Sequence, residues 1–346
     1  MSDEMSPKTF VTVSSKGKRN GLSDVENDGA DFGPDTPGTK SSGINEAIEH
    51  SKSGYVMLLE GEFITDVPII IKEGISLFGN QRSIITNNLD DPFEPVLNFR
   101  PYSSSSFLIV NANGKSGIMM GERGNNSIKV QYVKVYNTGN SYFEGGRSNV
   151  AVSIRGFNVM IGTMDIYKGN IGLKMDGASD IRITDLQVVE ATSGLIIVSS
   201  EHVTFDHLSV DSCSHIGVQI DSSSDISLSG VVWNNATSCP ANSLTYGIIL
   251  GNYSSDRRNT VINIEASIIG TGGTGIRLSN TNLCVLNLKI VNDVLNTLGK
   301  EITVGLEYGN GLGIVHANVL MENVELPFSG PIAGHLTING KAISNI

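Results

Sequence analysis

Hydrophobic residues recur in one fixed pattern along the middle of the chain. Each copy reads apolar-x-apolar-x-x-apolar-x-apolar, so a gap of two residues separates two alternating apolar pairs. Alternation with a period of two is typical of a strand that buries one face, and the gap predicts a corner between two such strands. The copies are Ile128, Val130, Val133 and Val135; Val159, Ile161, Met164 and Ile166; Ile181, Ile183, Leu186 and Val188; Val203, Phe205, Leu208 and Val210; and Ile226, Leu228, Val231 and Trp233.

A second series of strands, each led by glycine, accompanies these copies. Equivalent glycines are 22 to 30 residues apart. Three short strands per repeat, each stacked about 4.8 Å from its equivalent in the next repeat, predict an all-β, single-stranded parallel β-helix with three strands per rung. A leucine-rich solenoid fits less well because the L-x-x-L-x-L signature is missing. The glycine-led strands are Gly172–Asp176, Gly194–Val198, Gly217–Asp221, Gly247–Leu250, Gly275–Ser279 and Gly305–Tyr308.

The segment before the repeats predicts a helix that closes the first rung. Ile44, Ala47 and Ile48 share one face of a helix over about residues 42–52, and such a helix hides an open strand edge. Residues 1–28 combine Lys and Arg with Ser and Gly, which indicates an extended or flexible N-terminal arm. We therefore expect the β-helix domain to span 29–346, with rung insertions at 83–127, 137–149, 234–246, 253–260 and 292–301.

Four motifs open the repeat region, namely Asp31–Thr36, Ser42–Ile48, Gly54–Phe63 and Gly74–Gly79. Together they resemble the pectin-lyase-like superfamily of right-handed parallel β-helices, in its pectate-lyase-type and phage-tailspike branches. The family usually has Asp-Asp-Thr before the helix, where this chain has Thr39-Lys-Ser-Ser42. The resemblance implies a right-handed coil with an N-terminal capping helix, and an active groove along the outward face of one sheet.

The balance of charges argues against nucleic-acid and anionic-membrane partners. The chain has a formal net charge of -11 and a sequence pI near 5.0, whereas phosphate binding needs clustered Lys and Arg. A neutral glycan fits this balance, and an anionic polysaccharide needs a local basic patch. No apolar run reaches the ~20 residues of a membrane span, so we expect no membrane insertion.

The N-terminus and the cysteines bear on where the protein acts. MSDEMSPKTF lacks the charged-then-apolar pattern of a signal peptide, so we expect synthesis in a cytoplasm and action in a virion or outside the cell. Cys213, Cys239 and Cys284 are odd in number and widely spaced. They predict buried thiols rather than a disulfide framework or a zinc site.

The outward positions of the glycine-led strands supply the candidate catalytic residues Asp176, Asp221, Lys174 and Arg277. Two rungs separate the aspartates by about 10 Å, near the upper end of the spacing in inverting glycosidases. Lys174 and Arg277 are suited to orienting a uronate or stabilising developing charge. The two outward columns are Ser153, Lys174, Ile196, Gln219, Ile249, Arg277 and Glu307, and Arg155, Asp176, Val198, Asp221 and Ser279.

Substrate-binding side chains are expected in and beside these columns, because aromatic rings stack on sugars and polar groups bond hydroxyls. Trp233 falls in an inward slot of the repeat, so we assign it to the core. The candidates for substrate binding are Arg155, Gln219, Glu307, Tyr246 and Tyr253.

The alternative interpretation of these columns is ordinary surface. Ile196 and Val198 lie between the aspartates, which favours a surface packed under a loop or another subunit. In the polygalacturonase branch the same stretch carries paired aspartates and Gly-His-Gly, where this chain has Thr192, Ser193 and a histidine, His215, followed by Ile-Gly. This departure implies that the hydrolytic mechanism of that branch is missing here.

One acidic segment has the spacing of a calcium loop. Asp24, Glu26, Asp28, Gly29 and Asp35 fall at positions 1, 3, 5, 6 and 12 of the EF-hand pattern. Pro34 interrupts the segment, the closing residue is Asp rather than Glu, and no helix is expected on either side. We therefore expect no metal and no cofactor, with calcium at this segment as the alternative.

Three classes of function remain open at this point. The leading hypothesis is a tailspike-like protein that binds carbohydrate and degrades it as a polysaccharide lyase or glycoside hydrolase. The second is a non-catalytic structural or adhesive protein, such as a virion component that forms a homotrimer. The third is a transferase or epimerase that acts on sugars, because fold does not determine function. Whether the protein is an enzyme is therefore undecided by its sequence.

Overall fold

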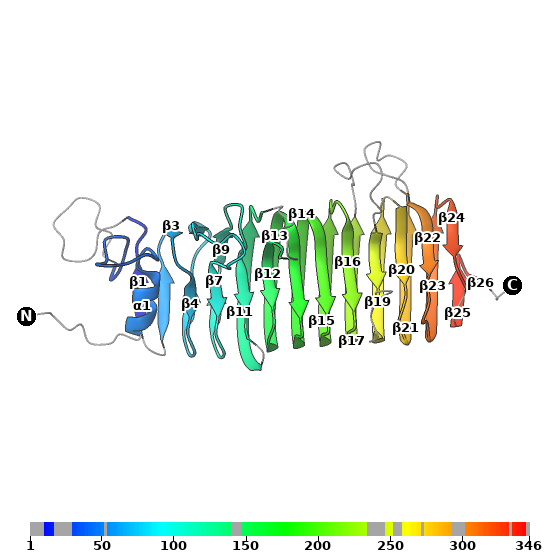
Figure 1. Ribbon diagram of the computed structural model, residues 1–346, viewed down its shortest axis with the longest axis horizontal. Helices are drawn as coiled ribbons and strands as arrows, with labels where there is room; N and C mark the ends of the chain where they lie inside the picture. Colours follow the sequence, from blue (N-terminus) through cyan, green and yellow to red (C-terminus); the bar gives the residue numbers. More distant parts are fainter. Residues whose placement is uncertain are drawn as a thin grey trace, which may run out of the picture. The chain divides into compact units, whose positions relative to one another are not determined.

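The computed structural model describes residues 10–16, 30–51, 54–122, 124–139, 147–233, 246–251, 258–270, 273–292, 302–331 and 334–343. The chain divides into two compact units, residues 1–165 and 166–346, with the boundary inside strand β13 (Phe157–Asp176). Each unit is built from short strands that run side by side (Figure 1). We describe each unit by itself.

The first unit consists of three parallel ladders of strands, which is the three-stranded rung that the sequence predicts. One ladder joins β2, β5, β8 and β11, the second joins β3, β6, β9 and β11, and the third joins β4, β7, β10 and β12. The bounds are β1 (Phe10–Val13), β2 (Tyr55–Leu58), β3 (Gly61–Thr65), β4 (Ile69–Ile71), β5 (Ser76–Phe78), β6 (Ser83–Asn87), β7 (Leu97–Phe99), β8 (Ser104–Ser106), β9 (Leu108–Asn111), β10 (Ile118–Met120), β11 (Asn125–Tyr136) and β12 (Val150–Ile154).

The expected insertion at 83–127 is wrong, because this segment contains the five strands β6 to β10. Three of them are only three residues long, and buried serines interrupt their apolar alternation: Ser105 is 5% exposed and Ser106 is 7% exposed. A strand this short with serine in buried positions does not show the period of two on which the sequence prediction depends.

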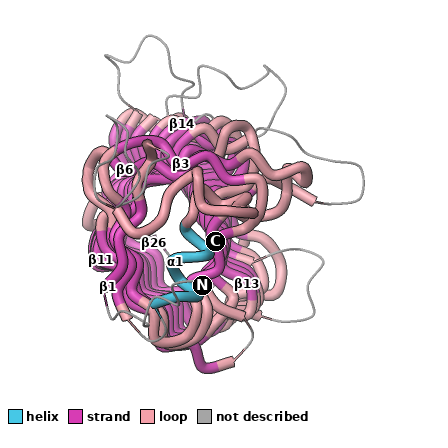
Figure 2. Tube along the Cα trace, turned by 90° about the vertical axis from the view of Figure 1, so that its left-hand side faces the viewer, coloured by secondary structure: helices cyan, strands magenta, loops and turns pink. Residues whose placement is uncertain are grey.

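Helix α1 (Ile44–Ser51) packs against β1, β2 and β4, and Figure 2 shows it across the mouth of the first unit. Ile44, Ala47 and Ile48 are buried, as the sequence predicts. The backbone N–H of Asn45 donates to Ser41 Oγ at 3.1 Å, which satisfies one of the free donors in the first turn. The Asn45 side chain donates to the carbonyl of Pro68 at 2.9 Å and accepts from the N–H of Ile70 in β4 at 3.2 Å, so the helix is bonded directly to a strand that it covers.

Residues 10–13 lie within the range that the sequence assigns to an N-terminal arm, and here the structure differs. They form β1, which pairs in parallel register with β2. Val11 and Val13 are fully buried, and this alternation is typical of a strand that buries one face in the sheet. The domain boundary near residue 28 stays a prediction, because residues 17–29 lie outside the described part of the chain.

The second unit repeats one bent strand and one glycine-led strand per rung. The bent strands β15, β17, β19, β21, β23 and β25 pair in parallel order, as do the glycine-led strands β16, β18, β20 and β22, and β24 continues the second series without a glycine. The bounds are β14 (Ser179–Val198), β15 (Glu201–Asp211), β16 (Ile216–Asp221), β17 (Ser224–Trp233), β18 (Tyr246–Leu250), β19 (Thr260–Ile269), β20 (Gly273–Leu278), β21 (Leu283–Val291), β22 (Ile302–Tyr308), β23 (Ile314–Glu322), β24 (Leu326–Ser329), β25 (Gly334–Ile338) and β26 (Lys341–Ile343). The predicted β-helix is thereby confirmed.

The last predicted repeat copy is wrong in its second half. Val232 is buried, whereas Trp233 is 43% exposed and is therefore not a core residue. The register shifts by one residue at the corner, so that Gly230 pairs with Leu208. A Cβ at Gly230 would come within 1.9 Å of the Leu208 carbonyl oxygen, so only glycine fits there. The corner in β17 is thus one residue shorter than the repeat pattern requires.

Buried polar side chains stack at the turn that follows each glycine-led strand. Ser200 Oγ accepts from the N–H of Ala178 at 3.2 Å, and Ser223 Oγ accepts from the N–H of Ser200 at 3.2 Å. On the next rung, Asn259 Oδ1 accepts from the N–H of Ser223 at 2.9 Å, and Asn259 Nδ2 donates to the Ile220 carbonyl at 2.9 Å. We call these three side chains, Ser200, Ser223 and Asn259, the turn ladder. It satisfies backbone groups that are removed from water.

We expect Asn259→Ala to destabilise the second unit. The substitution leaves the buried N–H of Ser223 without its partner, which costs about 2 kcal/mol, whereas the Ile220 carbonyl keeps a second bond from the N–H of Gly251. Urea unfolding followed by circular dichroism measures the loss as a lower midpoint. Asn263→Ala is the matched control, because Asn263 is exposed on the neighbouring strand and its loss should change the free energy of unfolding by less than about 0.5 kcal/mol. Equal midpoints for the two variants would contradict a stabilising role for the turn ladder.

Candidate functional site

The outward column that the sequence predicts on the glycine-led strands is present in the second unit. Parallel pairing aligns Ile196 with Gln219, then Ile249, Arg277 and Glu307 on successive rungs. The alternate residues of the same strands are buried, so this column points away from the interior. We call the surface formed by these five residues and Tyr246 the glycine-led face.

Arg277 contacts two neighbouring side chains on this face. Its Nη1 donates to Tyr246 Oη at 3.0 Å, and its guanidinium carbon lies 5.5 Å from the centre of the Tyr246 ring. Arg277 Nε also lies 3.7 Å from Glu307 Oε1 on the next rung. Tyr246 is only 6% exposed, so its ring is held by the surrounding residues where it contacts the Arg277 guanidinium. Three of the predicted site residues are therefore brought into contact.

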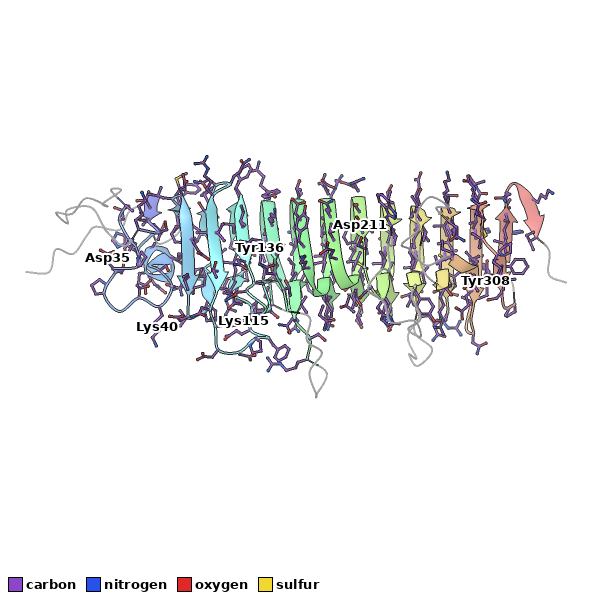
Figure 3. The ribbon with its side chains drawn as sticks, turned by 90° about the horizontal axis from the view of Figure 1, so that it is seen from above. Asp35, Lys40, Lys115, Tyr136, Asp211 and Tyr308 are labelled. Carbon is purple, nitrogen blue, oxygen red and sulfur yellow. The ribbon has the colours of Figure 1, made fainter. Side chains whose placement is uncertain are left out.

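Tyr308, labelled in Figure 3, follows Glu307 along β22 and is buried. It is 4% exposed, and burial raises the pKa of its hydroxyl, with a further contribution from Cys284. A phenol held protonated inside the unit does not take part in acid–base chemistry at the glycine-led face.

The other three predicted catalytic residues are not gathered around Arg277. Lys174 Nζ lies 3.8 Å from Asp176 Oδ2, which makes an ion pair on one rung. Asp221 follows two rungs later, is 8% exposed, and accepts from Ser222 Oγ at 3.3 Å. Arg277 lies four rungs beyond Lys174, or about 19 Å at the spacing of parallel strands. One sugar ring therefore cannot contact all four side chains.

The remaining predicted binding residues are dispersed. Gln219 is half-buried in the middle of the glycine-led face. Arg155 is exposed just beyond β12 and belongs to the first unit. Tyr253 lies outside the described residues.

The calcium hypothesis is not tested by the structure. Asp24, Glu26, Asp28 and Gly29 lie outside the described residues. Across the ranges that are described, no group of three or more His, Cys, Asp or Glu side chains is placed to hold a metal ion. The expectation of no cofactor therefore stays a prediction.

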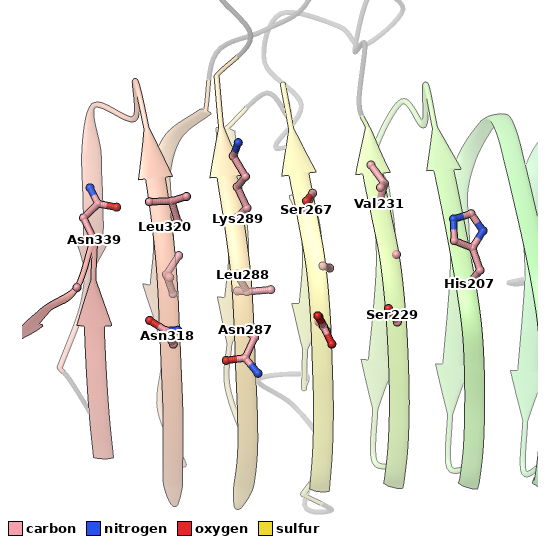
Figure 4. Close-up of a pocket in the computed structure, with 15 residues that line it drawn as sticks. His207, Ser229, Val231, Ser267, Asn287, Leu288, Lys289, Asn318, Leu320 and Asn339 are labelled. Carbon is pink, nitrogen blue, oxygen red and sulfur yellow. The ribbon is translucent and has the colours of Figure 1, made fainter.

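A groove of about 560 Å³ on the bent strands of the second unit was not predicted from the sequence. Figure 4 shows two rows of side chains along it, with Ser229, Asn287 and Asn318 in one row and Val231, Ser267, Lys289 and Leu320 in the other. His207, on β15, lines one end of the groove, and its Nδ1 lies 2.9 Å from Asp185 Oδ1. The sequence signal was available, because Asn287 and Asn318 occupy outward positions of alternating strands.

Comparison with known proteins identifies the fold. No protein-family model and no curated protein sequence matches the chain. Among solved structures, the Dettilon tailspike protein matches with a TM-score of 0.63 at 12% identity, over 84% of this chain and 61% of the tailspike. PfbA, a surface adhesin of Streptococcus pneumoniae, matches with a TM-score of 0.58 at 12% identity, over 88% of this chain and 95% of the adhesin.

The A-module of a mannuronan C-5 epimerase from Azotobacter vinelandii matches with a TM-score of 0.53 at 12% identity, over 90% of this chain and 98% of the module. The chain has the pectin-lyase-like, right-handed β-helix fold. This agrees with the resemblance that the N-terminal motifs indicate. The β-helix spans less than two thirds of the length of the tailspike that it matches.

The described part of this β-helix has no helix that is both long enough and apolar enough to cross a membrane. Its single described helix, α1, has eight residues.

Cys213 and Cys284 are not candidate nucleophiles. Cys213 is 1% exposed and Cys284 is fully buried, as the sequence predicts, while Cys239 lies outside the described residues. Burial raises the pKa of the Cys213 thiol to about 12, and it raises that of Cys284 as well. Nucleophilic attack needs the thiolate, which is scarce at neutral pH when the pKa is this high.

We expect Cys213 and Cys284 to resist alkylation by iodoacetamide in the native protein at pH 8. The same thiols should react fully in urea, where they regain an ordinary pKa and contact with the reagent. Peptide mapping by mass spectrometry measures each cysteine separately, and the urea-treated sample is the control. Rapid labelling of native Cys213 would show that the β-helix opens at this rung.

Proposed function

We propose that this protein binds polysaccharide in the manner of a tailspike, along the glycine-led face of its second unit. The observation that carries the proposal is the contact of Arg277 with Tyr246 and Glu307, because it holds a cation and a carboxylate on an outward face, with a buried aromatic ring supporting the cation. Sugar recognition uses such groups, which bond hydroxyls with fixed geometry. Gln219, two rungs away, extends the polar column.

The fold supports this class of function. A mannuronan C-5 epimerase, a tailspike and a surface adhesin share the β-helix with this chain. Because the identity is low and fold does not determine function, the neighbours supply a class of ligand and a location, not a reaction. A place in a virion or on a cell surface is consistent with the tailspike and the adhesin.

The charges on the glycine-led face favour an uncharged glycan. Lys174 and Arg277 each lie within 4 Å of a carboxylate, at 3.8 Å and 3.7 Å respectively. A local basic patch is therefore not formed by these two cations, and the chain as a whole carries a net charge of -11. A uronate polymer would be repelled by the surrounding field.

A structural or adhesive role is the second candidate function. Ile196, Val198 and Ile249 are half-buried and outward-facing, with Ile196 and Val198 on one rung and Ile249 two rungs further, beyond Gln219. Apolar side chains in this arrangement suit contact with another subunit, as in a homotrimer. The glycan-binding measurement separates the two functions, because a purely structural protein leaves every glycan unbound.

We expect Arg277→Ala to weaken polysaccharide binding about tenfold, since a hydrogen bond to a charged group contributes roughly 1.5 to 3 kcal/mol. A panel of uncharged and uronate polysaccharides, measured by affinity electrophoresis, provides the readout. Arg182→Ala is the matched control, because Arg182 is an exposed arginine that is bonded to Asp206 on a different strand face. Equal losses in the two variants, or no glycan bound by the unaltered protein, would refute the proposal.

Cleavage is tested at the two aspartates with the same panel, by following reducing ends and the absorbance of unsaturated uronate. We expect Asp176→Asn and Asp221→Asn to leave any turnover unchanged, because Val198 stands between the two carboxylates and Asp221 is buried. Thermal melting checks that both variants stay folded. Loss of turnover in both variants, with folding intact, would show instead that the pair is catalytic.

A further inference from the structure

The groove on the bent strands has a regular construction that the glycine-led face lacks. Parallel pairing aligns Ser229, Glu265, Asn287 and Asn318 on four successive rungs, in a row that we call the amide rail. The same pairing aligns Val231, Ser267, Lys289 and Leu320, which we call the second rail.

The floor between the rails is made by residues whose side chains are small or turned inward. Gly230 and Ala266 occupy it on two rungs, and Leu288 and Val319 continue it with buried side chains. Missing side-chain volume at Gly230 and Ala266 explains why the surface is hollow there. A smaller hollow of about 220 Å³ adjoins the groove and shares Ser229, Glu265 and Asn287 with it.

The polar groups of the amide rail point to a hydroxyl-rich ligand. Glu265, Asn287 and Asn318 are exposed, and within the described ranges their side chains have no hydrogen-bond partner. A primary amide donates and accepts at once, which matches the two roles of a sugar hydroxyl. Neighbouring rungs present these groups about 4.8 Å apart, so they form a row along which a chain of sugar rings can lie.

The apolar groups of the second rail complete the match. Leu320 is 46% exposed, and the aliphatic stem of Lys289 lies beside it on the next strand. A sugar ring has an apolar face of C–H groups as well as its hydroxyls, and binding sites for such ligands combine apolar contact with a few placed polar groups. The amide rail therefore supplies hydrogen bonds, and the second rail supplies apolar contact.

Negative charges outnumber positive ones in and beside the groove. Glu265 and Lys289 carry opposite charges on neighbouring rungs, and Lys289 Nζ lies 3.4 Å from Glu322 Oε1. Asp185 lies beside His207 at one end. A polyanion would meet Glu265, Glu322 and Asp185, so the groove favours an uncharged chain.

We propose that this groove is a second carbohydrate site, which binds an uncharged polysaccharide in an extended form along the rungs of the second unit. It lies on the bent strands β17, β19, β21 and β23, whereas the glycine-led face lies on the other strand of each rung. The inference rests on the proposed function for the class of ligand only. It is a binding site, and it requires no reaction at the groove.

The test uses the full chain with uncharged gluco- and xylo-oligosaccharides, and oligogalacturonate as the charged counterpart. Titration calorimetry is carried out in the Arg277→Ala background, where binding at the glycine-led face is weakened. We expect saturable binding of an uncharged probe to persist, and the added pair Asn287→Ala and Asn318→Ala to weaken it at least tenfold. Oligogalacturonate should bind more weakly than the uncharged probes.

The matched control adds Asn282→Ala and Asn310→Ala instead, because both asparagines are exposed in the same unit and neither lines the groove. Thermal melting checks that all variants stay folded. If binding survives the Asn287→Ala and Asn318→Ala pair, the groove proposal is contradicted and the proposed function stands. The same conclusion follows if Arg277→Ala alone abolishes binding. Binding that is unaffected by Arg277→Ala and removed by the groove pair supports the groove and overturns the glycine-led face. No binding by the unaltered protein overturns both.

Discussion

In-register hydrogen bonding between equivalent residues of successive rungs is the constraint on which the second unit depends. Parallel pairing joins Ile226 to Ile262, Ile262 to Cys284 and Cys284 to Val315, so the position of one side chain determines the position of its equivalents. The turn ladder reinforces this register where the chain changes direction. Inward columns become a continuous apolar interior, and outward columns become rows of like-facing groups, because a strand alternates its side chains with a period of two.

This constraint explains what could be predicted from the sequence. The column from Ile196 to Glu307 follows from alternation alone, and the structure has it in the predicted order. Prediction failed where alternation is broken by local chemistry. At Gly230 a close approach to a neighbouring carbonyl shortens the corner and turns Trp233 outward. In residues 83–127, the strands of the three ladders are short and contain buried serines, so the sequence pattern does not reveal them.

The candidate site shows the same division between local and tertiary information. Sequence spacing selects Arg277, Tyr246 and Glu307 as separate candidates, but their mutual contact depends on the register of three rungs. Sequence spacing also overstates the catalytic set, because four rungs separate Lys174 from Arg277. The groove was missed because its hollow depends on the absent side chain of Gly230 and the small side chain of Ala266, which leave no apolar signal in the sequence.

The nearest-neighbour pairing of rungs also makes the second unit extendable. Each bent strand bonds only to the strand before it and the strand after it, so adding or removing one complete repeat leaves the other pairings intact. Evolution can therefore lengthen or shorten the outer surface in steps of about 4.8 Å without rebuilding the interior. The length of such a scaffold therefore changes only by whole repeats.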